Sequence, residues 1–212
     1  MEAMRMKEEK ILTDKKMLKA GSNIDNLLIS CITSIDGEKP TEKKILDMLS
    51  GDRSYLLYHL RIMSYGSEYE TDENCPYCKK NTHYVFDLEK LIEDGKIKIT
   101  GEPEGGLEKN ITVSDGSIVT VTALDGHRER RLKTKGENIT TMDMTLALMK
   151  AINGETVTTS AMENWIGKDL KAIRHAGGEL TGGLIPAVKV ECEHCDREHD
   201  LVLTASASFF IQ

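Results

Sequence analysis

Two short cysteine motifs decide the fold: Cys75-Pro76-Tyr77-Cys78 and Cys192-Glu193-His194-Cys195, which 113 residues separate. A histidine and an extended apolar stretch follow each motif, so each reads as a tight two-cysteine turn that feeds a returning strand. Two such turns that face one another place four thiolates at the corners of a tetrahedron, the closed arrangement of a structural zinc site. The sequence therefore predicts Zn²⁺ bound by Cys75, Cys78, Cys192 and Cys195.

Three histidines near the motifs offer a different ligand set. His83 follows the first pair, His194 lies inside the second pair, and His199 follows it. Because four cysteines already complete a tetrahedral zinc site, no histidine is required. We interpret all three as solvated surface side chains and keep them only as alternative ligands.

A redox function is a second interpretation of Cys75-Pro76-Tyr77-Cys78. Glutaredoxins carry the same dithiol at the N-terminus of a helix, which lowers the pKa of the thiolate. In this chain the motif lies between acidic Glu70–Glu73 and the strand-like stretch Thr82–Leu88, with no βαβ unit around it. Acidic neighbours raise the pKa of a thiol, so a thiol oxidoreductase is the less favoured alternative.

A nucleic-acid adaptor built on the zinc ribbon is a third interpretation, because His127–Lys135 is a concentrated positive stretch. Its five cations are Arg128, Arg130, Arg131, Lys133 and Lys135. No aromatic residues alternate with them to stack on bases, as they do in grooves that bind single strands. A solvated connection, or a rim that docks another protein, explains the segment equally well.

Composition limits the partners. The 212 residues include 28 Lys and Arg against 35 Asp and Glu, so the net charge is 28 − 35 = −7, which argues against a general electrostatic grip on nucleic acid or an anionic membrane. No apolar run approaches the roughly 20 residues that span a bilayer, and no signal-peptide block opens the chain. Five cysteines, an odd number, suit a reducing cytoplasm. No Ser/His/Asp, Cys/His or paired-carboxylate order is recognisable, so nothing supports an enzyme.

The N-terminal third is predicted to hold an arm, a strand and two helices. Residues 4–20 mix a few apolar residues with many charges, which is typical of a helical or extended arm that a partner orders. The β-branched run Leu27–Ile35 predicts a strand, closed by an Asp-Gly turn. Thr41 is placed to cap a short helix that ends near Gly51, and a second helix is predicted from Arg53 to Tyr65.

The middle of the chain is predicted to contain antiparallel sheet and two helices. Asn110–Leu124 has the pattern of a hairpin, because an Asp-Gly pair separates two β-branched runs. Apolar spacing favours one helix over Thr141–Asn153, and Ser160–Glu163 resembles a capping box that opens another, stopped by Gly177-Gly178. The glycine-rich segment Gly177–Pro186 is typical of a flexible connection.

Together these elements predict an α+β fold: a zinc ribbon with an inserted antiparallel-sheet and helical subdomain and an N-terminal helical or extended arm. The predicted divisions are residues 1–40 for the arm and strand, 41–66 for the helical pair, 67–90 with 184–212 for the zinc ribbon, and 91–183 for the inserted β-hairpin and helical subdomain. The insertion explains why the two cysteine pairs lie so far apart in the sequence.

The block Gly51–Tyr69, followed closely by Cys75-Pro76-Tyr77-Cys78, resembles the hallmark block of the T-even-type phage baseplate family. That family contains the baseplate hub assembly protein of contractile-tailed phages. The second pair, Cys192-Glu193-His194-Cys195, and the C-terminal Phe209-Phe210 continue the resemblance. It covers two stretches, residues 40–90 and 140–212.

The resemblance implies a non-enzymatic structural or assembly component of the baseplate hub, in contact with other baseplate, hub and tail proteins. It implies assembly in the host cytoplasm and a place in the tail baseplate of the virion, and it leaves open a homo-oligomer within a symmetric tail. A zinc-closed ribbon would present rigid strands. The helix Arg53–Tyr65 and the N-terminal arm are then the expected docking elements.

Overall fold

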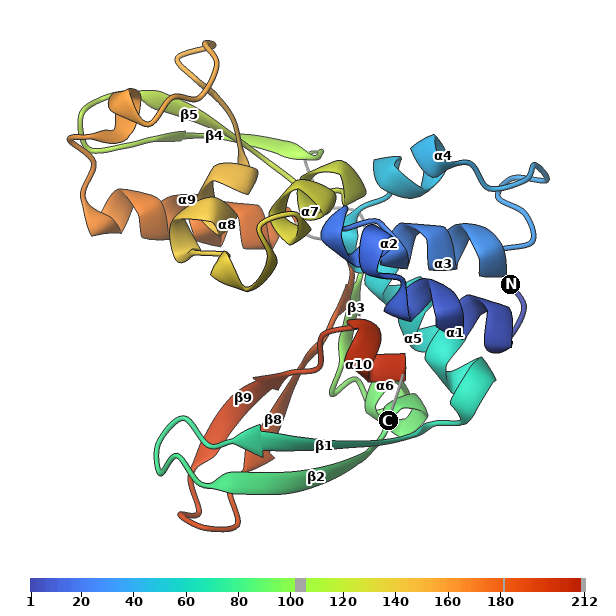
Figure 1. Ribbon diagram of the computed structural model, residues 1–212. Helices are drawn as coiled ribbons and strands as arrows, with labels where there is room; N and C mark the ends of the chain where they lie inside the picture. Colours follow the sequence, from blue (N-terminus) through green and yellow to red (C-terminus); the bar gives the residue numbers. More distant parts are fainter. Residues whose placement is uncertain (102–105, 181, 211–212) are drawn as a thin grey trace.

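The computed structural model describes residues 1–101, 106–180 and 182–210, which form a mixed α+β fold of short helices and small antiparallel sheets (Figure 1). The α-helices are α1 (Met6–Thr13), α2 (Lys15–Lys19), α3 (Asn23–Cys31), α4 (Glu42–Asp47), α5 (Ser50–Tyr65), α6 (Leu88–Glu93), α7 (Gly126–Lys133), α8 (Thr141–Ala147), α9 (Gly167–Glu179) and α10 (Ala207–Phe210). The strands are β1 (Glu68–Asn74), β2 (Asn81–Asp87), β3 (Lys98–Thr100), β4 (Glu108–Thr112), β5 (Ile118–Thr122), β6 (Met149–Ile152), β7 (Gly183–Ile185), β8 (Ala187–Glu191) and β9 (Glu198–Val202). Single turns of 3-10 helix span Gly136–Asn138 and Ser160–Met162. None of the described helices is long and apolar enough to cross a membrane.

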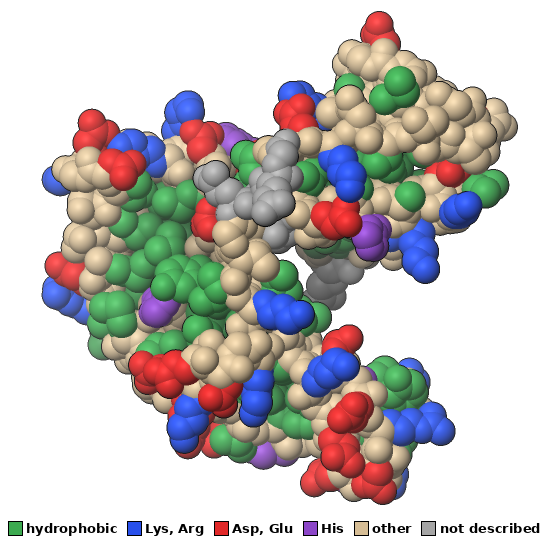
Figure 2. All heavy atoms as spheres, turned by 180° about the vertical axis from the view of Figure 1, so that it is seen from behind, with side chains coloured by type: hydrophobic (Ala, Val, Ile, Leu, Met, Phe, Trp, Pro, Cys, Tyr) green, Lys and Arg blue, Asp and Glu red, His purple; other side chains and the backbone are tan. Residues whose placement is uncertain are grey.

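The elements gather into three parts (Figure 1). Helices α1 to α5 form a helical lobe, and the antiparallel hairpins β1–β2 and β8–β9 extend away from it together. The segment from β4 to α9 forms an inserted lobe, and Figure 2 shows a hollow between this lobe and the hairpins. The helical lobe and the hairpins share one hydrophobic core, whereas the inserted lobe has a core of its own.

Helix α5 runs through the first of these cores. Its buried face follows the spacing i, i+4, i+7 and i+8 and consists of Arg53, Leu57, Leu60 and Arg61, each at most 4% exposed. The guanidinium of Arg61 donates to the carbonyl of Phe209 at 2.9 Å. This bond fastens the C-terminal α10 to the central helix.

The two helices predicted after Pro40 are confirmed, with shifted ends. The hydroxyl of Thr41 caps α4, because it accepts a hydrogen bond from the N–H of Lys44 at 3.2 Å. Helix α5 begins at Ser50, ahead of the predicted start. It ends at Tyr65 as predicted, and Gly66 follows with a φ of 88°, which favours glycine.

The prediction of a strand over Leu27–Ile35 was wrong, because most of this run belongs to helix α3. Four side chains, Ile24, Leu27, Leu28 and Cys31, follow i, i+3, i+4 and i+7, and each is at most 3% exposed. That is the spacing of one helix face. The helical pattern becomes visible only when Ile24, which precedes the β-branched run, is counted.

The N-terminal arm is helical and packs on the chain itself. Leu12 of α1 is fully buried. Glu8, which is 3% exposed, accepts a hydrogen bond from the Ser30 hydroxyl of α3 at 2.6 Å. Contacts with α3 therefore order the arm within the chain, whereas the sequence pattern predicts an arm that a partner orders.

The hairpin predicted at Asn110–Leu124 is confirmed by β4 and β5, which pair across the Asp115-Gly116 turn. The helix predicted over Thr141–Asn153 was wrong in its second half: α8 ends at Ala147, and Met149–Ile152 forms strand β6 along the other edge of β5. An open edge of β5 would leave backbone groups unpaired. Sheet pairing therefore overrides the helical spacing of the apolar residues.

Helix α9 begins at Gly167, so the capping box predicted at Ser160–Glu163 was wrong. The start is set by Asp169, whose carboxylate accepts hydrogen bonds from the N–H groups of Ile166 and Ser114, both at 3.0 Å. Ser114 lies in the turn between β4 and β5. One carboxylate thus caps the helix and fastens it to the hairpin.

The prediction of a flexible connection over Gly177–Pro186 was also wrong. Helix α9 continues to Glu179, and β7 pairs with β3. Thr181 lies outside the described residues. A Cβ atom on Gly51 would lie 1.5 Å from the carbonyl oxygen of Gly182, so the backbone of this segment lies directly against the start of α5.

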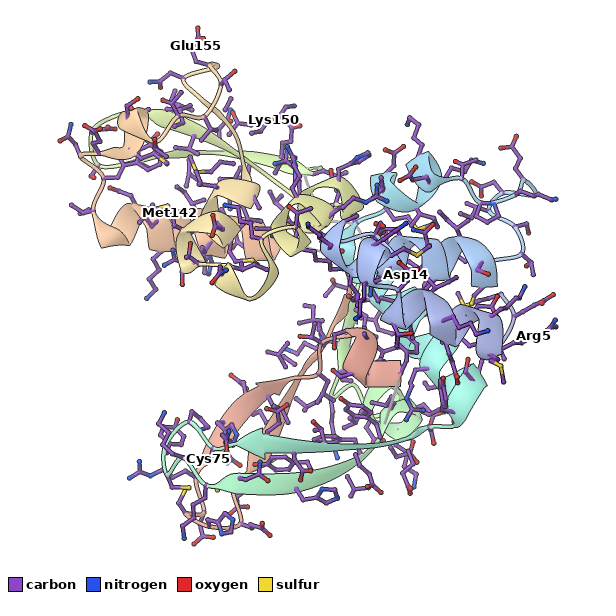
Figure 3. The ribbon with its side chains drawn as sticks, in the orientation of Figure 1. Arg5, Asp14, Cys75, Met142, Lys150 and Glu155 are labelled. Atoms are coloured by element: carbon purple, nitrogen blue, oxygen red, sulfur yellow. The ribbon has the colours of Figure 1, made fainter. Side chains whose placement is uncertain are left out.

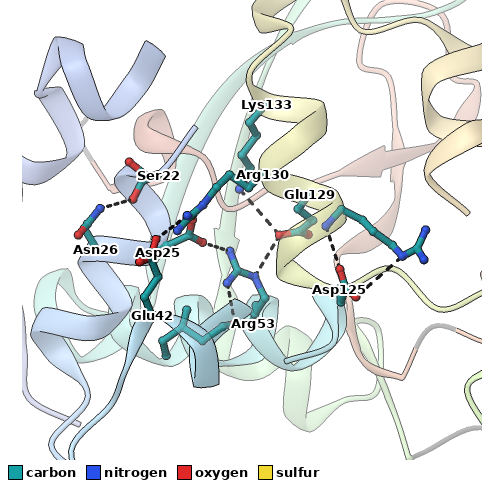
Figure 4. A network of polar contacts seen from close by, with 11 residues as sticks. Ser22, Asp25, Asn26, Glu42, Arg53, Asp125, Glu129, Arg130 and Lys133 are labelled. Atoms are coloured by element: carbon teal, nitrogen blue, oxygen red, sulfur yellow. Dashed lines mark hydrogen bonds and ion pairs between the residues drawn. The ribbon is translucent and has the colours of Figure 1, made fainter. Parts of the chain in front are cut away.

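A network of charges joins the helical lobe to the inserted lobe (Figure 4). Arg53 of α5, 2% exposed, donates to Asp25 of α3 at 2.5 Å and to Glu129 of α7 at 3.1 Å. It also donates to the carbonyl of Ile45 at 3.0 Å. Arg130 of α7 donates to the same Asp25 at 2.7 Å. We call Asp25, Arg53, Glu129 and Arg130 the Arg53 junction; three helices from distant parts of the sequence meet in it.

Candidate metal centre

The two cysteine pairs lie in turns of the same geometry at the ends of the two hairpins. In the first turn the N–H of Cys75 donates to the Lys80 carbonyl, and the Cys75 carbonyl accepts from the N–H of Lys79. The second turn repeats both bonds at the same spacing from Cys192. The residue after the second cysteine is left-handed in both turns, with φ of 62° at Lys79 and 54° at Asp196. The similarity of the two motifs in the sequence is therefore a similarity of structure.

The four sulfur atoms meet where the hairpin ends face one another; Figure 3 labels Cys75 there. All four Sγ atoms lie within 4.8 Å of one another. The sulfurs of Cys75 and Cys195 are 3.8 Å apart, and those of Cys78 and Cys192 are 3.7 Å apart. A tetrahedral zinc ion with Zn–S bonds of about 2.3 Å separates its sulfurs by about 3.8 Å, whereas a disulfide requires about 2.05 Å. The donor set and its spacing fit a metal ion held by four thiolates.

The surroundings of the cluster supply hydrogen bonds to sulfur. Cys75 and Cys192 are at most 1% exposed, and the other two cysteines are half-buried. The hydroxyl of Thr82, itself buried, lies 3.6 Å from the sulfur of Cys192, and the N–H of Tyr77 donates to the sulfur of Cys75 at 3.4 Å. Such contacts orient the ligands of a metal site and stabilise their negative charge.

The pKa values of the thiols differ across the cluster. A hydrogen bond from the backbone of Cys78 lowers the pKa of Cys75. Burial opposes the ionisation of Cys192, but hydrogen bonds led by the Thr82 hydroxyl outweigh it and lower the pKa of Cys192 to about 6. Burial, together with the neighbouring sulfurs, raises the pKa of Cys195 to about 12. Burial and the neighbouring sulfurs thus oppose a thiolate at Cys195, and a bound cation would balance that charge.

The three histidines named as alternative ligands lie outside the sulfur cluster. His83 has its Nδ1 3.0 Å from a carboxylate oxygen of Asp72 on the paired strand β1. The Nε2 of His194 lies 3.0 Å from the carbonyl oxygen of Asn81. His199 packs edge-on against aromatic rings. His83 and His194 therefore have polar partners that explain them without a metal. The prediction of a solvated surface side chain was wrong for His199, because its Nδ1 is buried and forms no hydrogen bond within the described residues.

The setting of Cys75-Pro76-Tyr77-Cys78 differs from that of a redox dithiol. The motif joins two antiparallel strands, whereas the glutaredoxin motif opens a helix. Each of its two sulfurs lies within 3.8 Å of a sulfur of the second cysteine pair, at the distance that a shared metal ion requires. This geometry favours metal binding over disulfide exchange.

Most cations of the basic segment His127–Lys135 have partners within the chain. Partners within the chain engage four of the five cations of the basic segment: Arg128 with the Ala147 carbonyl, Arg130 with Asp25, Lys133 with Glu129, and Lys135 with Asp143. Among the described residues, the side chain of Arg131 forms no hydrogen bond or ion pair. One free cation is a weak basis for binding nucleic acid.

The Arg53 junction was not predicted from the sequence. Asp25 and Glu129 look like ordinary surface charges in the sequence, yet Asp25 is only 1% exposed. One signal was available: Arg53 lies on the same helix face as Leu57 and Leu60. A charged residue on an apolar face is usually buried together with a partner of opposite charge.

The comparison with protein families covers nearly the whole chain. The model of the family described as T4 bacteriophage base plate protein matches residues 1–211. No curated protein and no solved structure matches the chain. The family match extends the resemblance seen at residues 40–90 and 140–212 through the inserted lobe. The chain therefore belongs to the family of T4 bacteriophage base plate proteins.

Proposed function

We propose that the chain is a structural or assembly component of the baseplate hub of a contractile-tailed phage. It acts through contacts with other baseplate, hub and tail proteins, and catalysis has no part in its role. Membership in the base plate protein family supports the phage role. The place in the hub, assembly in the host cytoplasm and a position in the virion tail are the finer parts of this proposal.

The proposal includes a structural Zn²⁺ bound by Cys75, Cys78, Cys192 and Cys195. The observation that carries it is the approach of four sulfurs to within 4.8 Å at the ends of two like turns. When bound, zinc supplies a four-thiolate link between the two hairpins and keeps no open position for a substrate. Residues 67–90 and 184–212 then form a zinc ribbon, with 91–183 as its inserted unit.

Elemental analysis of freshly purified protein, combined with thiol titration, tests the metal. We expect one zinc per chain, with the cluster thiols reacting only after denaturation or chelation. Cys31 is the internal reference for a thiol that burial alone protects. It lies outside the cluster, and burial raises its pKa to about 11. Protein without zinc that contains a Cys75–Cys78 disulfide would overturn the metal site and favour redox chemistry.

Substitution in the phage tests the biological role. We expect Cys75→Ser to abolish the folded ribbon and the completion of baseplates together. Cys31→Ala, which removes a buried cysteine outside the cluster, is expected to leave baseplates intact. Normal particle yield with Cys75→Ser would contradict the proposal. Complete tails in a phage that lacks this protein would also contradict it, even if the wild-type protein binds zinc.

A further inference from the structure

Strand β8 has a free edge. Among the described strands, β8 pairs only with β9. The pairing is flanked by two backbone bonds, from Leu203 N–H to the Pro186 carbonyl at 2.7 Å and from Cys192 N–H to the Arg197 carbonyl at 3.1 Å. The register between them is regular, so the even-numbered residues of β8 bond to β9.

The odd-numbered residues of β8 therefore point their N–H and C=O groups away from β9. These residues are Ala187, Lys189 and Glu191. Figure 1 shows β3 and α6 on this side of β8, and β3 already pairs with β7, the strand that leads into β8. A further strand laid along β8 would continue the line of β3. An unpaired edge of this kind accepts extended segments of other proteins.

A groove of about 830 Å³ lies along this edge. Its apolar wall includes Val85 and Phe86 of β2, Leu91 of α6 and Ile185 of β7. Val85 is 56% exposed, although its type is usually buried. The groove thus offers apolar surface for alternate side chains of an added strand, beside backbone groups for its main chain.

The charge of the groove indicates the composition of the segment that fits it. Four lysines and three aspartates line the groove, an excess of one positive charge. Lys98 and Lys189 form no ion pair within the described residues, although Asp200, which also lines the groove, lies opposite Lys189 in the β8–β9 register. Two further lysines of the groove lie at the limit of ion pairing, at 3.8 Å from Asp87 and 4.0 Å from Asp94. A segment that carries carboxylates beside its apolar residues would complement these cations.

We propose that the free edge of β8 and its groove bind an extended, acidic and apolar segment of another protein by strand addition. Backbone groups of Ala187 and Lys189 pair with the segment, its apolar side chains enter the groove, and its carboxylates meet Lys98 and Lys189. This inference rests on the proposed function only for the origin of the segment, which is a neighbouring baseplate protein. The binding chemistry itself requires no baseplate and is testable on the isolated chain.

The test uses the zinc-loaded full chain and a fluorescein-labelled peptide of alternating valine and aspartate. We expect fluorescence anisotropy to show binding with a Kd on the order of 100 μM. A peptide of alternating valine and lysine, and an aspartate peptide N-methylated at alternate residues, are expected to bind at least about tenfold more weakly. Equal binding of the N-methylated peptide, or no binding of the aspartate peptide near 1 mM, would overturn strand addition.

Two pairs of variants assign the edge. Lys189→Pro removes an N–H from the free edge of β8 and is expected to weaken binding at least about tenfold. Glu198→Pro removes an N–H from the outer edge of β9 and is the matched control, expected to leave binding unchanged. If a proline variant fails to fold, Lys189→Glu with Lys171→Glu on α9 as control tests the same edge through charge.

Sedimentation of the unliganded chain tests whether a second copy of the chain occupies the edge. A dimer that Lys189→Pro abolishes would assign the edge to a second copy and overturn the acidic-segment proposal. Because the peptide experiments use no phage, their failure leaves the zinc and baseplate tests unaffected. Conversely, if the chain binds the peptide but phage tails form without the chain, only the baseplate role is overturned.

Discussion

The cysteine cluster and the Arg53 junction both join parts of the chain that are far apart in the sequence, but with opposite chemistry. The cluster gathers four like groups, whose negative charges repel one another unless a cation lies between them. The Arg53 junction gathers opposite charges, and Arg53 and Asp25 satisfy one another at 2.5 Å without any ligand. The proposed zinc link requires a cation from outside the chain, whereas the ion pairs of the Arg53 junction form between side chains of the chain itself. Within the described residues, the buried Nη2 of Arg130 is left without a hydrogen bond.

Because of this difference, we expect the hairpins and the inserted lobe to depend on different interactions for their stability. The hairpins β1–β2 and β8–β9 are small two-stranded sheets, which are marginal on their own. The inserted lobe has its own hydrophobic core, and two largely buried ion pairs hold it to the helical lobe: Arg130 with Asp25 of α3, and Glu129 with Arg53 of α5. We therefore expect the hairpins to respond to metal and the lobe connection to respond to substitution of charges.

Removal of zinc is expected to have the largest effect. Structural four-ligand zinc sites contribute roughly 10 kcal/mol or more, which is comparable with the whole stability of a domain. We expect a chelator to expose the amides of β1, β2, β8 and β9 to hydrogen exchange while β5 and α9 of the inserted lobe stay protected. Mass spectrometry of exchanged peptides measures both regions in one experiment. Unchanged protection of the hairpins in protein shown to be free of zinc would remove the distinction between the two connections.

Arg53→Met is expected to have the next largest effect. The substitution leaves Asp25 with one cation instead of two and Glu129 without its buried partner. Loss of one partner of a buried ion pair typically costs about 3–5 kcal/mol. Urea unfolding measures the loss, and zinc content is expected to stay at the wild-type level.

Arg53→Lys is the matched control for this prediction. A lysine keeps the charge, but its single ammonium group cannot bond to Asp25, Glu129 and the Ile45 carbonyl with the geometry of a guanidinium. We expect a smaller loss than for Arg53→Met. A change below about 1 kcal/mol for Arg53→Met would show that the junction contributes no more than an exposed pair.

Thr82→Val is expected to act on the cluster alone. Valine has nearly the shape of threonine but cannot donate to the sulfur of Cys192, which lies 3.6 Å from the Thr82 hydroxyl. Loss of such a contact typically weakens metal binding by 10–100-fold. Competition with a coloured chelator measures the affinity. Thr71→Val on the neighbouring strand β1 is the control, and an equal effect of both substitutions would mean that the sulfur contact is irrelevant.

The structure follows the sequence pattern where a local motif determines the backbone. The spacing within Cys75–Cys78 and Cys192–Cys195 is set by a turn only a few residues long, and the same holds for the Asp115-Gly116 hairpin. The structure departs from the pattern where contacts between distant residues determine the backbone. The segment Met149–Ile152 has helical spacing but becomes a strand because β5 has an edge to fill.

The Arg53 junction shows a second limit. Its four side chains come from three helices, so no spacing in the sequence relates them. The sequence could have revealed that Arg53 faces inward, from its position relative to Leu57 and Leu60. It could not have identified Asp25 and Glu129 as the partners, because many acidic residues lie on other described helices, such as Glu42 of α4 and Asp143 of α8. Partner choice is a property of the packed structure.

Asp143 of α8 combines charge and hydrogen bonds as the Arg53 junction does, but at the surface of the inserted lobe. Its carboxylate pairs with Lys135 and accepts hydrogen bonds from the N–H and hydroxyl of Thr140 at 2.9 and 2.7 Å. The Lys135 contact and the Thr140 bonds lower the pKa of Asp143 from 3.8 to about 2. A lowered pKa means that the folded state favours the carboxylate. Its stabilisation is therefore complete above about pH 4 and is lost as the pH falls through about 2.

We expect Asp143→Asn to have the smallest effect of the series: a slightly lower urea midpoint at about pH 7, with the difference from wild type closing as the pH falls from about 4 to 2. Unfolding curves at several pH values measure this, and Lys135→Met, which keeps the Thr140 bonds, separates the ion pair from the helix cap. A difference that stays constant down to about pH 2 would show that the carboxylate charge contributes nothing. The expected small effect follows from solvent, because water screens the Lys135–Asp143 pair but is excluded from Arg53 and Asp25.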